Sequence, residues 1–61
     1  MIDDEIVGLD IDEATDLIAE AGLTSRIEYE DGQVYMLTMD MRSDRINLSV
    51  ENGKVIKTRR G

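Results

Sequence analysis

The 61-residue chain carries 14 acidic and seven basic residues, for a net charge of −7, and it contains neither cysteine nor histidine. These absences exclude disulfides, thiolate sites and catalysis by serine–histidine or cysteine–histidine pairs. A domain of this size buries only about 60% of the surface of its unfolded chain. We therefore expect a small acidic domain that is not an enzyme and holds no cofactor and no metal.

The charges are unevenly distributed along the chain. Residues 1–41 hold twelve acidic residues and one basic residue, whereas residues 42–61 hold six basic residues and two acidic ones. A basic segment can bind nucleic acid, and here it would use Arg42, Arg45, Lys54, Lys57, Arg59 and Arg60. The acidic field of the whole chain would repel phosphate, and two tyrosines are the only aromatic residues available for stacking on bases. We expect the basic strands to neutralise the acidic part of the fold, with no nucleic-acid partner.

Neither a membrane-spanning segment nor a signal peptide is visible. No apolar stretch approaches the roughly 18 residues that a transmembrane helix needs, and no basic region is followed by an apolar run. We expect no membrane contact and, if the chain is complete, a cytoplasmic location. Nothing in the pattern demands more than a monomer.

The first patterned segment predicts a helix over residues 11–21. Residues 1–8 form an acidic lead-in, with Ile6 and Val7 as candidate anchors. Asp10 is a good N-cap, and Glu13 three residues later completes a capping box. Gly22 suits the position after the helix, where a positive φ is common. Apolar residues recur at helical spacing at Ile11, Ala14, Leu17, Ile18 and Ala21.

The remaining patterned segments predict strands. Residues 25–30 alternate, which places Ile27 and Tyr29 on one face, and Asp31-Gly32 is a turn signal. Residues 45–51 also alternate, and Asn52-Gly53 is a strong two-residue hairpin signal before residues 54–60. The residues expected to point into the core from these last two strands are Ile46, Leu48, Val50, Val55 and Ile56.

Together these elements predict one α+β domain over residues 1–61, in which a helix packs on a small mixed β-sheet. The hairpin is expected over about residues 45–59, and an extended, exposed loop over about residues 34–44. The stretch "YMLTMDMRS" within this loop also permits a plain strand, with Tyr35, Leu37, Met39 and Met41 on one face. Methionine is more often core filler than functional.

The order of residues in "TMDMRSDR" (38–45) resembles the binding loop of the potato inhibitor I family of serine-protease inhibitors, which includes the barley chymotrypsin inhibitors. It is also similar to the related bacterial and fungal elastase-inhibitor family. The flanking sequences "VGLDIDEA" (7–14) and "DRINLSVENGKVIKTRRG" (44–61) resemble the opening, the strands and the terminal glycine of the family. The resemblance therefore covers most of the chain.

The resemblance implies a rigid loop that enters a protease cleft as a substrate would. Met39 would be the P1 residue, which fills the primary specificity pocket, and Met39–Asp40 would be the scissile bond. An apolar P1 implies subtilisin-, chymotrypsin- or elastase-like targets. The implied protease-binding loop consists of Met36, Leu37, Thr38, Met39, Asp40, Met41 and Arg42, and the implied loop-supporting residues are Asp44, Arg45 and Asn47.

Because side chains alternate along a strand, Arg45 and Asn47 share the face opposite the core. The resemblance implies that they donate hydrogen bonds to loop acceptors such as Thr38 and Asp40. Asn47 stands where plant members have a second arginine, and it cannot make a charged, forked contact. About two additional residues precede Thr38, which predicts a small extra hairpin at the Asp31-Gly32 turn.

A second hypothesis keeps the inhibitor-like fold without the activity. In that case the chain would be a protein-interaction module, and Met36, Met39 and Met41 would form an adaptable apolar patch for another partner. Order in the loop separates the two hypotheses, because a mobile, easily cleaved loop would not inhibit.

Overall fold

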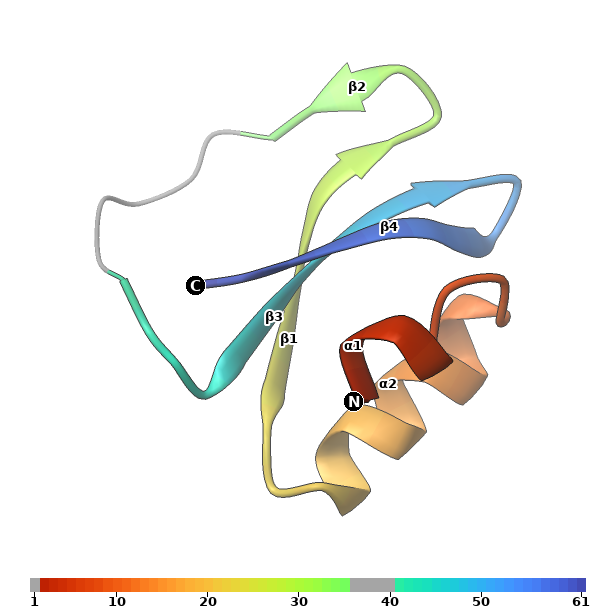
Figure 1. Cartoon of the computed structure of the whole chain (residues 1–61). Coiled ribbons are helices and arrows are strands. Elements are labelled where there is room, and N and C mark those ends of the chain that lie inside the picture. The colour runs from red at the N-terminus through yellow and green to blue at the C-terminus, as the bar shows by residue number, and fades with distance from the viewer. Residues whose placement is uncertain (1, 36–40) are drawn as a thin grey trace.

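The computed structural model describes residues 2–35 and 41–61, and it confirms an α+β fold in which one main helix packs on a four-stranded mixed sheet (Figure 1). The predicted loop over residues 34–44 overlaps a short strand at Val34, and its residues 36–40 lie outside the described part of the chain. The elements in chain order are α1 (Ile2–Glu5), α2 (Ile11–Glu20), β1 (Thr24–Glu30), β2 (Gln33–Val34), β3 (Arg45–Glu51) and β4 (Lys54–Arg60).

The strands lie in the order β2-β1-β3-β4; the neighbours β1 and β3 pair in parallel, whereas β2 pairs with β1 and β4 pairs with β3 in antiparallel fashion. Val34 pairs with Tyr29 near the end of β1, whereas Arg45 pairs with Thr24 at its start. Five residues of strand separate these two points, which corresponds to about 17 Å. The segment that joins β2 to β3 therefore begins and ends at different heights along β1.

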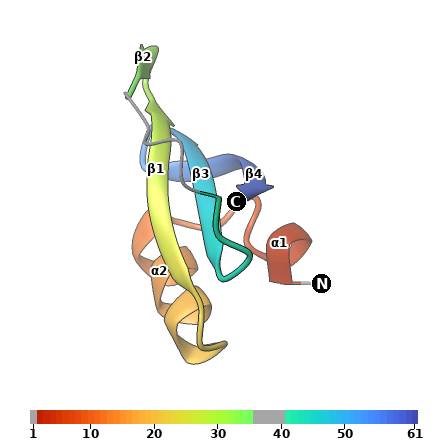
Figure 2. The same ribbon diagram turned by 90° about the vertical axis from the view of Figure 1, so that its left-hand side faces the viewer.

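A single apolar core fills the space between α2 and one face of the sheet. In Figure 2, β1 and β3 lie in front of α2, and α1 lies to the right of the sheet, below β4. The predicted inward stripe of β3 is confirmed, because Ile46, Leu48 and Val50 are fully buried. The other buried apolar residues of this core are Ile6, Ala14, Ile18 and Val55, with Ile2, Leu9, Ile11 and Leu23 packed at its edge.

The N-terminus of α2 differs from the predicted capping box. Asp10 occupies the N-cap position, but its side chain makes no cap hydrogen bond. Its carboxylate instead lies 3.2 Å from Lys54 Nζ, and the Ile11 amide donates to the Gly53 carbonyl at 2.9 Å. The turn between β3 and β4 thus takes over one of the unpaired amides of the helix.

The C-terminus of α2 is as predicted. Gly22 has a φ of +78°, and its amide donates to Ala19 O at 3.0 Å. The Leu23 amide donates to Ile18 O, also at 3.0 Å. This pair of bonds is the Schellman motif, and it directs the half-buried Leu23 toward the core.

Two strand predictions were wrong, and both concern residues at irregularities of the sheet. The register shifts between Ile27 and Tyr29, so Tyr29 pairs with Ser49 and lies on the face opposite Ile27. Its hydroxyl donates to Glu51 Oε1 at 2.9 Å. Ile56 is 46% exposed and not buried as predicted, because it directly follows the inward Val55 and alternates away from the core. It is also the extra residue at a second shift, opposite Ser49 and Val50. An extra residue in a strand reverses the faces of the residues that follow it.

Both predicted two-residue turns are present. Asp31 and Gly32 have φ values of 49° and 89°, and Asn52 and Gly53 have φ values of 53° and 75°. Positive φ at both central residues is the type I′ geometry that suits the twist of a hairpin. The first turn joins β1 to β2, which confirms the predicted extra hairpin.

Within the N-terminal lead-in, Ile2–Glu5 form the short helix α1, which the sequence did not predict. Ile6 is fully buried, as expected of an anchor, but Val7 is 45% exposed. α1 is joined to β4 through Asp3, whose main-chain oxygen accepts from Thr58 Oγ1 at 3.1 Å. The Asp3 carboxylate accepts from Arg60 Nη2 at 2.6 Å and from Arg60 Nε at 3.1 Å.

Acidification is expected to remove the contribution that the ionised Asp3 makes to the free energy of unfolding. The hydrogen bonds from Arg60 keep the pKa of Asp3 below its ordinary value of 3.8. The unfolded chain therefore binds a proton at this carboxylate first as the pH falls. The contribution is complete above about pH 5 and disappears as the pH drops through the lower, folded-state pKa.

Thermal melting of Asp3→Asn tests this expectation. The variant should melt below the wild type at about pH 6, and the gap should narrow as the pH falls toward about 2, because protonation of Asp3 removes its charge. Asp4→Asn, an exposed change on the same helix, is the matched control. A gap of the same size at both pH values would contradict the expectation.

Candidate functional site

The segment between β2 and β3 is anchored to β1 on its N-terminal side. The Tyr35 amide donates to Glu28 O at 3.1 Å, and the Tyr35 hydroxyl donates to Glu30 Oε1 at 3.0 Å. This hydrogen bond to Glu30 is the main reason that the pKa of Tyr35 is raised. Val34 beside it is 76% exposed. The chain therefore leaves the sheet from a fixed position.

The C-terminal side of the same segment, residues 41–44, is called here the C-terminal flank. Arg42 Nε and Nη2 donate to the two carboxylate oxygens of Asp44 at 3.0 and 2.9 Å, which lowers the pKa of Asp44. The Asp44 carbonyl accepts from the Thr24 amide at 2.8 Å. Asp44, a predicted support, thus fastens the C-terminal flank to the start of β1.

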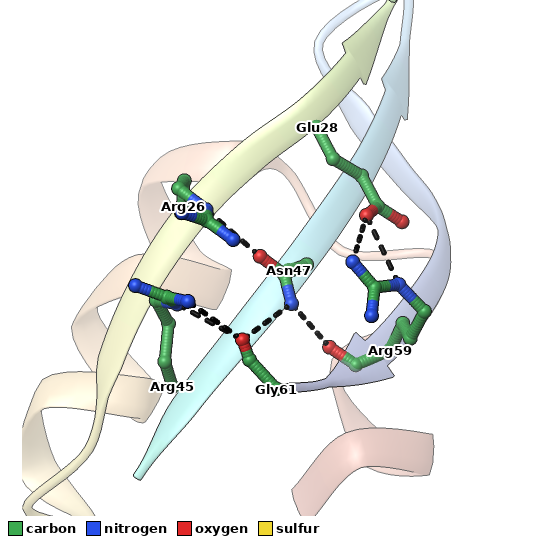
Figure 3. A network of polar contacts seen from close by, with 6 residues as sticks. All are labelled: Arg26, Glu28, Arg45, Asn47, Arg59 and Gly61. Carbon is green, nitrogen blue, oxygen red and sulfur yellow. Dashed lines mark hydrogen bonds and ion pairs between the residues drawn. The ribbon is translucent and has the colours of Figure 1, made fainter. Parts of the chain in front are cut away.

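A buried polar network lies on the face of the sheet opposite the core (Figure 3). Arg45 is 9% exposed and Asn47 is fully buried. Arg45 donates to the main-chain oxygen of Gly61 through Nε at 3.1 Å and through Nη2 at 2.9 Å. Asn47 Nδ2 donates to Gly61 O and to Arg59 O, both at 3.2 Å. Two predicted supports therefore meet at the residue that follows β4.

Sequence reasoning missed the outer members of this network. Arg26 Nε donates to Asn47 Oδ1 at 3.0 Å. Arg59 donates to Glu28 Oε1 through Nε at 3.1 Å and through Nη2 at 2.8 Å. In the sheet, Asn47 pairs with Arg26 on one side and with Arg59 on the other. The period-2 pattern of β1 placed Arg26 opposite Ile27, but only the parallel pairing brings it beside Asn47.

Gly61 joins this network to the C-terminal flank. Its φ of +140° is one that residues with a Cβ rarely adopt. A Cβ there would lie 3.6 Å from Met41 Cε and 3.9 Å from Asn47 Nδ2. Met41 thus reaches back over Gly61, although its side chain as a whole is 80% exposed. A hollow of about 450 Å³ beside this contact is lined by Met41, Arg42, Ser43, Arg60 and Gly61.

Of the predicted site residues, Met41, Arg42 and Asp44 form the C-terminal flank. Arg45 and Asn47 follow it in β3. The other predicted loop residues, Met36, Leu37, Thr38, Met39 and Asp40, lie outside the described residues. The implied bonds from Arg45 and Asn47 to Thr38 and Asp40 therefore stay predictions. Both hydrogens of the Asn47 amide already go to main-chain oxygens of residues 59 and 61.

Basic side chains of the second half of the chain form ion pairs with acidic ones. Among the described residues these ion pairs include Arg42–Asp44, Lys54–Asp10, Arg59–Glu28 and Arg60–Asp3. Within residues 2–35 and 41–61, no three acidic side chains gather as a metal site would require. No helix in the described part of the chain is long and apolar enough to cross a membrane.

The chain matches no family model and no curated protein sequence.

Proposed function

We propose that this protein is a serine-protease inhibitor that acts through a substrate-like loop, with Met39 as P1 and Met39–Asp40 as the scissile bond. The observation that carries the proposal is the buried network at Gly61. There Arg45 and Asn47 donate to one main-chain oxygen, and the Met41 methyl group of the C-terminal flank lies 3.6 Å from the place that a Cβ of the same residue would take. A plain connecting loop needs no such support.

The support matters because an inhibitor of this kind must bind without losing much conformational entropy. A loop that already has its bound shape loses little on docking and gains affinity. With no cysteine in the chain, the support has to be non-covalent. Buried hydrogen bonds from a charged guanidinium are among the stronger ones in proteins, and Arg45 supplies two.

β1 holds both sides of the proposed loop. Tyr35 bonds to Glu28 and Glu30 near the end of this strand, and Asp44 bonds to Thr24 at its start. If a protease cuts Met39–Asp40, each new chain end belongs to a half that is still fastened to the same strand. Separation of the halves is then slow, and resealing of the bond competes with release of the fragments.

The proposed P1 residue defines the target class. Methionine is long, unbranched and apolar, so it suits the apolar pockets of subtilisin-, chymotrypsin- and elastase-like proteases. A trypsin-like pocket would leave its buried acidic group unpaired, which strongly disfavours an apolar side chain. Met36, at the proposed P4 position, adds a second apolar contact that favours subtilisin-like enzymes.

Titration of subtilisin and chymotrypsin with the protein tests the proposal. We expect activity to fall in proportion to added protein until one equivalent is present, and trypsin to be unaffected. Active-site-titrated protease and a chromogenic substrate give the measurement. Full activity of every enzyme at about 10 μM protein, equivalent to binding weaker than about −7 kcal/mol, would contradict it.

The interaction-module hypothesis also has support in the described residues. Val34, at the start of the predicted loop, and Met41, a member of the implied protease-binding loop, are 76% and 80% exposed, and exposed apolar side chains are common at binding surfaces. Limited proteolysis separates the two hypotheses. Rapid cleavage between residues 35 and 41 by any of several proteases favours the module, whereas resistance favours the inhibitor.

A further inference from the structure

The C-terminal flank is contacted from the core face of the sheet as well as from the polar face. Arg60 is level with the buried Ile46 in the sheet, so its side chain starts on the face that α1 and α2 cover. Its Nη1 donates to the Ser43 carbonyl at 2.8 Å. Its Nε and Nη2 donate to the two carboxylate oxygens of Asp3. One guanidinium therefore connects α1 to the C-terminal flank.

The geometry of this bridge is that of a forked, partly buried pair. Only 21% of the Asp3 side chain and 34% of the Arg60 side chain are exposed. The fork fixes the plane of the guanidinium, and that plane aims Nη1 at Ser43. Thr58, two residues before Arg60, holds the main chain of Asp3 through a separate hydrogen bond. α1 is thereby positioned independently of the bridge.

We propose that Asp3 is a positioning residue for the C-terminal flank: it orients Arg60, and Arg60 fixes the Ser43 carbonyl. The N-terminal helical turn is then part of the support of the loop, although it is far from the loop in the sequence. The consequence for inhibition rests on the proposed function. The order of the flank itself does not, because it can be measured in the protein alone.

Hydrogen exchange of two amides gives that measurement. The Thr24 amide donates to Asp44 O at 2.8 Å, so it reports whether the flank is docked. The Asp31 amide donates to Val50 O at 3.0 Å at the other end of the same strand pair, so it reports the sheet. In Asp3→Asn, any loss of global stability accelerates both amides, and we expect the acceleration of Thr24 to exceed that of Asp31 about tenfold.

Two further variants show whether Asp3 acts through Arg60. Asp4→Asn makes the same charge change at an exposed site of α1 and should leave both amides unchanged. Arg60→Lys keeps the charge but cannot bridge two partners in a fixed plane, so it should accelerate Thr24 as Asp3→Asn does. The double variant should be no faster than either single one. Equal acceleration of Thr24 and Asp31, or additive effects, would overturn the proposal.

Inhibition measured on the same variants separates this inference from the proposed function. If both hold, Asp3→Asn should weaken inhibition of subtilisin about three- to tenfold and Asp4→Asn should not. Faster Thr24 exchange in a protein whose wild type inhibits nothing would support the bridge and reject the inhibitor. Inhibition by the wild type, with unchanged Thr24 exchange and unchanged inhibition in Asp3→Asn, would reject the bridge alone.

Discussion

Replacing Met39 by lysine is expected to weaken inhibition of subtilisin and chymotrypsin at least about 100-fold, which corresponds to about 2.8 kcal/mol. The cause is the burial of an ammonium group in an apolar pocket that offers it no partner. The same change should create inhibition of trypsin, whose pocket contains an acidic group. Inhibition constants for the three proteases, measured with wild type and variant, give the comparison.

Met41→Lys is the matched control for this prediction. It introduces the same charge two residues away, at a side chain that is 80% exposed. We expect it to change inhibition of subtilisin less than tenfold, about 1.4 kcal/mol at most, and to give no inhibition of trypsin. If Met41→Lys redirected the protein to trypsin and Met39→Lys did not, the assignment of P1 to Met39 would be wrong.

The second large effect is expected at Asn47. Leucine has a similar shape but cannot donate to Arg59 O and Gly61 O or accept from Arg26. Leaving buried polar groups unpaired costs about 1–3 kcal/mol, so Asn47→Leu should lower the free energy of unfolding by about that amount. Chemical denaturation monitored by circular dichroism measures the loss.

Ser49→Ala is the control for Asn47→Leu, because Ser49 is the next residue on the same face of β3 and is 8% exposed. It should change stability by less than about 0.5 kcal/mol. Under the proposed function, Asn47→Leu should also be cleaved faster at Met39–Asp40, since Gly61 and the Met41 contact are less firmly held. Unchanged stability and unchanged cleavage would show that the network is not a support.

Local signals in the sequence were sufficient to predict most of the helices, strands and turns. The apolar spacing and Gly22 predicted α2 almost to the residue, and strict alternation predicted β3. The Asp31-Gly32 and Asn52-Gly53 pairs marked both tight hairpins, because few other residue pairs accept positive φ at two consecutive positions. In each case the determining interaction lies within a few residues.

Features that depend on distant partners were not predictable in the same way. Asp10 is a residue type that often caps helices. In the fold, however, the Gly53 carbonyl accepts from the first helical amide, and the Asp10 carboxylate forms an ion pair with Lys54. The irregularity after Ile27 reverses the face of Tyr29, and no turn residue marks it. The polar network needs β1 parallel to β3 and the chain end beside Arg45, and neither arrangement leaves a periodic signal in the sequence.

The structure gives Asn47 a different place from the one expected of it. The resemblance implies that a side chain at this position donates hydrogen bonds to the loop, and asparagine does so less strongly than the arginine of the plant members. In the fold, Asn47 is the fully buried centre of a row formed with Arg26 and Arg59. It donates to Gly61 O, and Arg45 donates to the same oxygen through two nitrogens of its charged guanidinium.

Mass spectrometry of the protein incubated with a catalytic amount of subtilisin tests the central claim most directly. The proposed inhibitor should be cut slowly and at one place, Met39–Asp40. The two fragments should stay together under native conditions, and intact chain should reappear when isolated cut protein is returned to the enzyme. Rapid and complete cleavage, cleavage at another bond of the loop, or immediate separation of the fragments would contradict it.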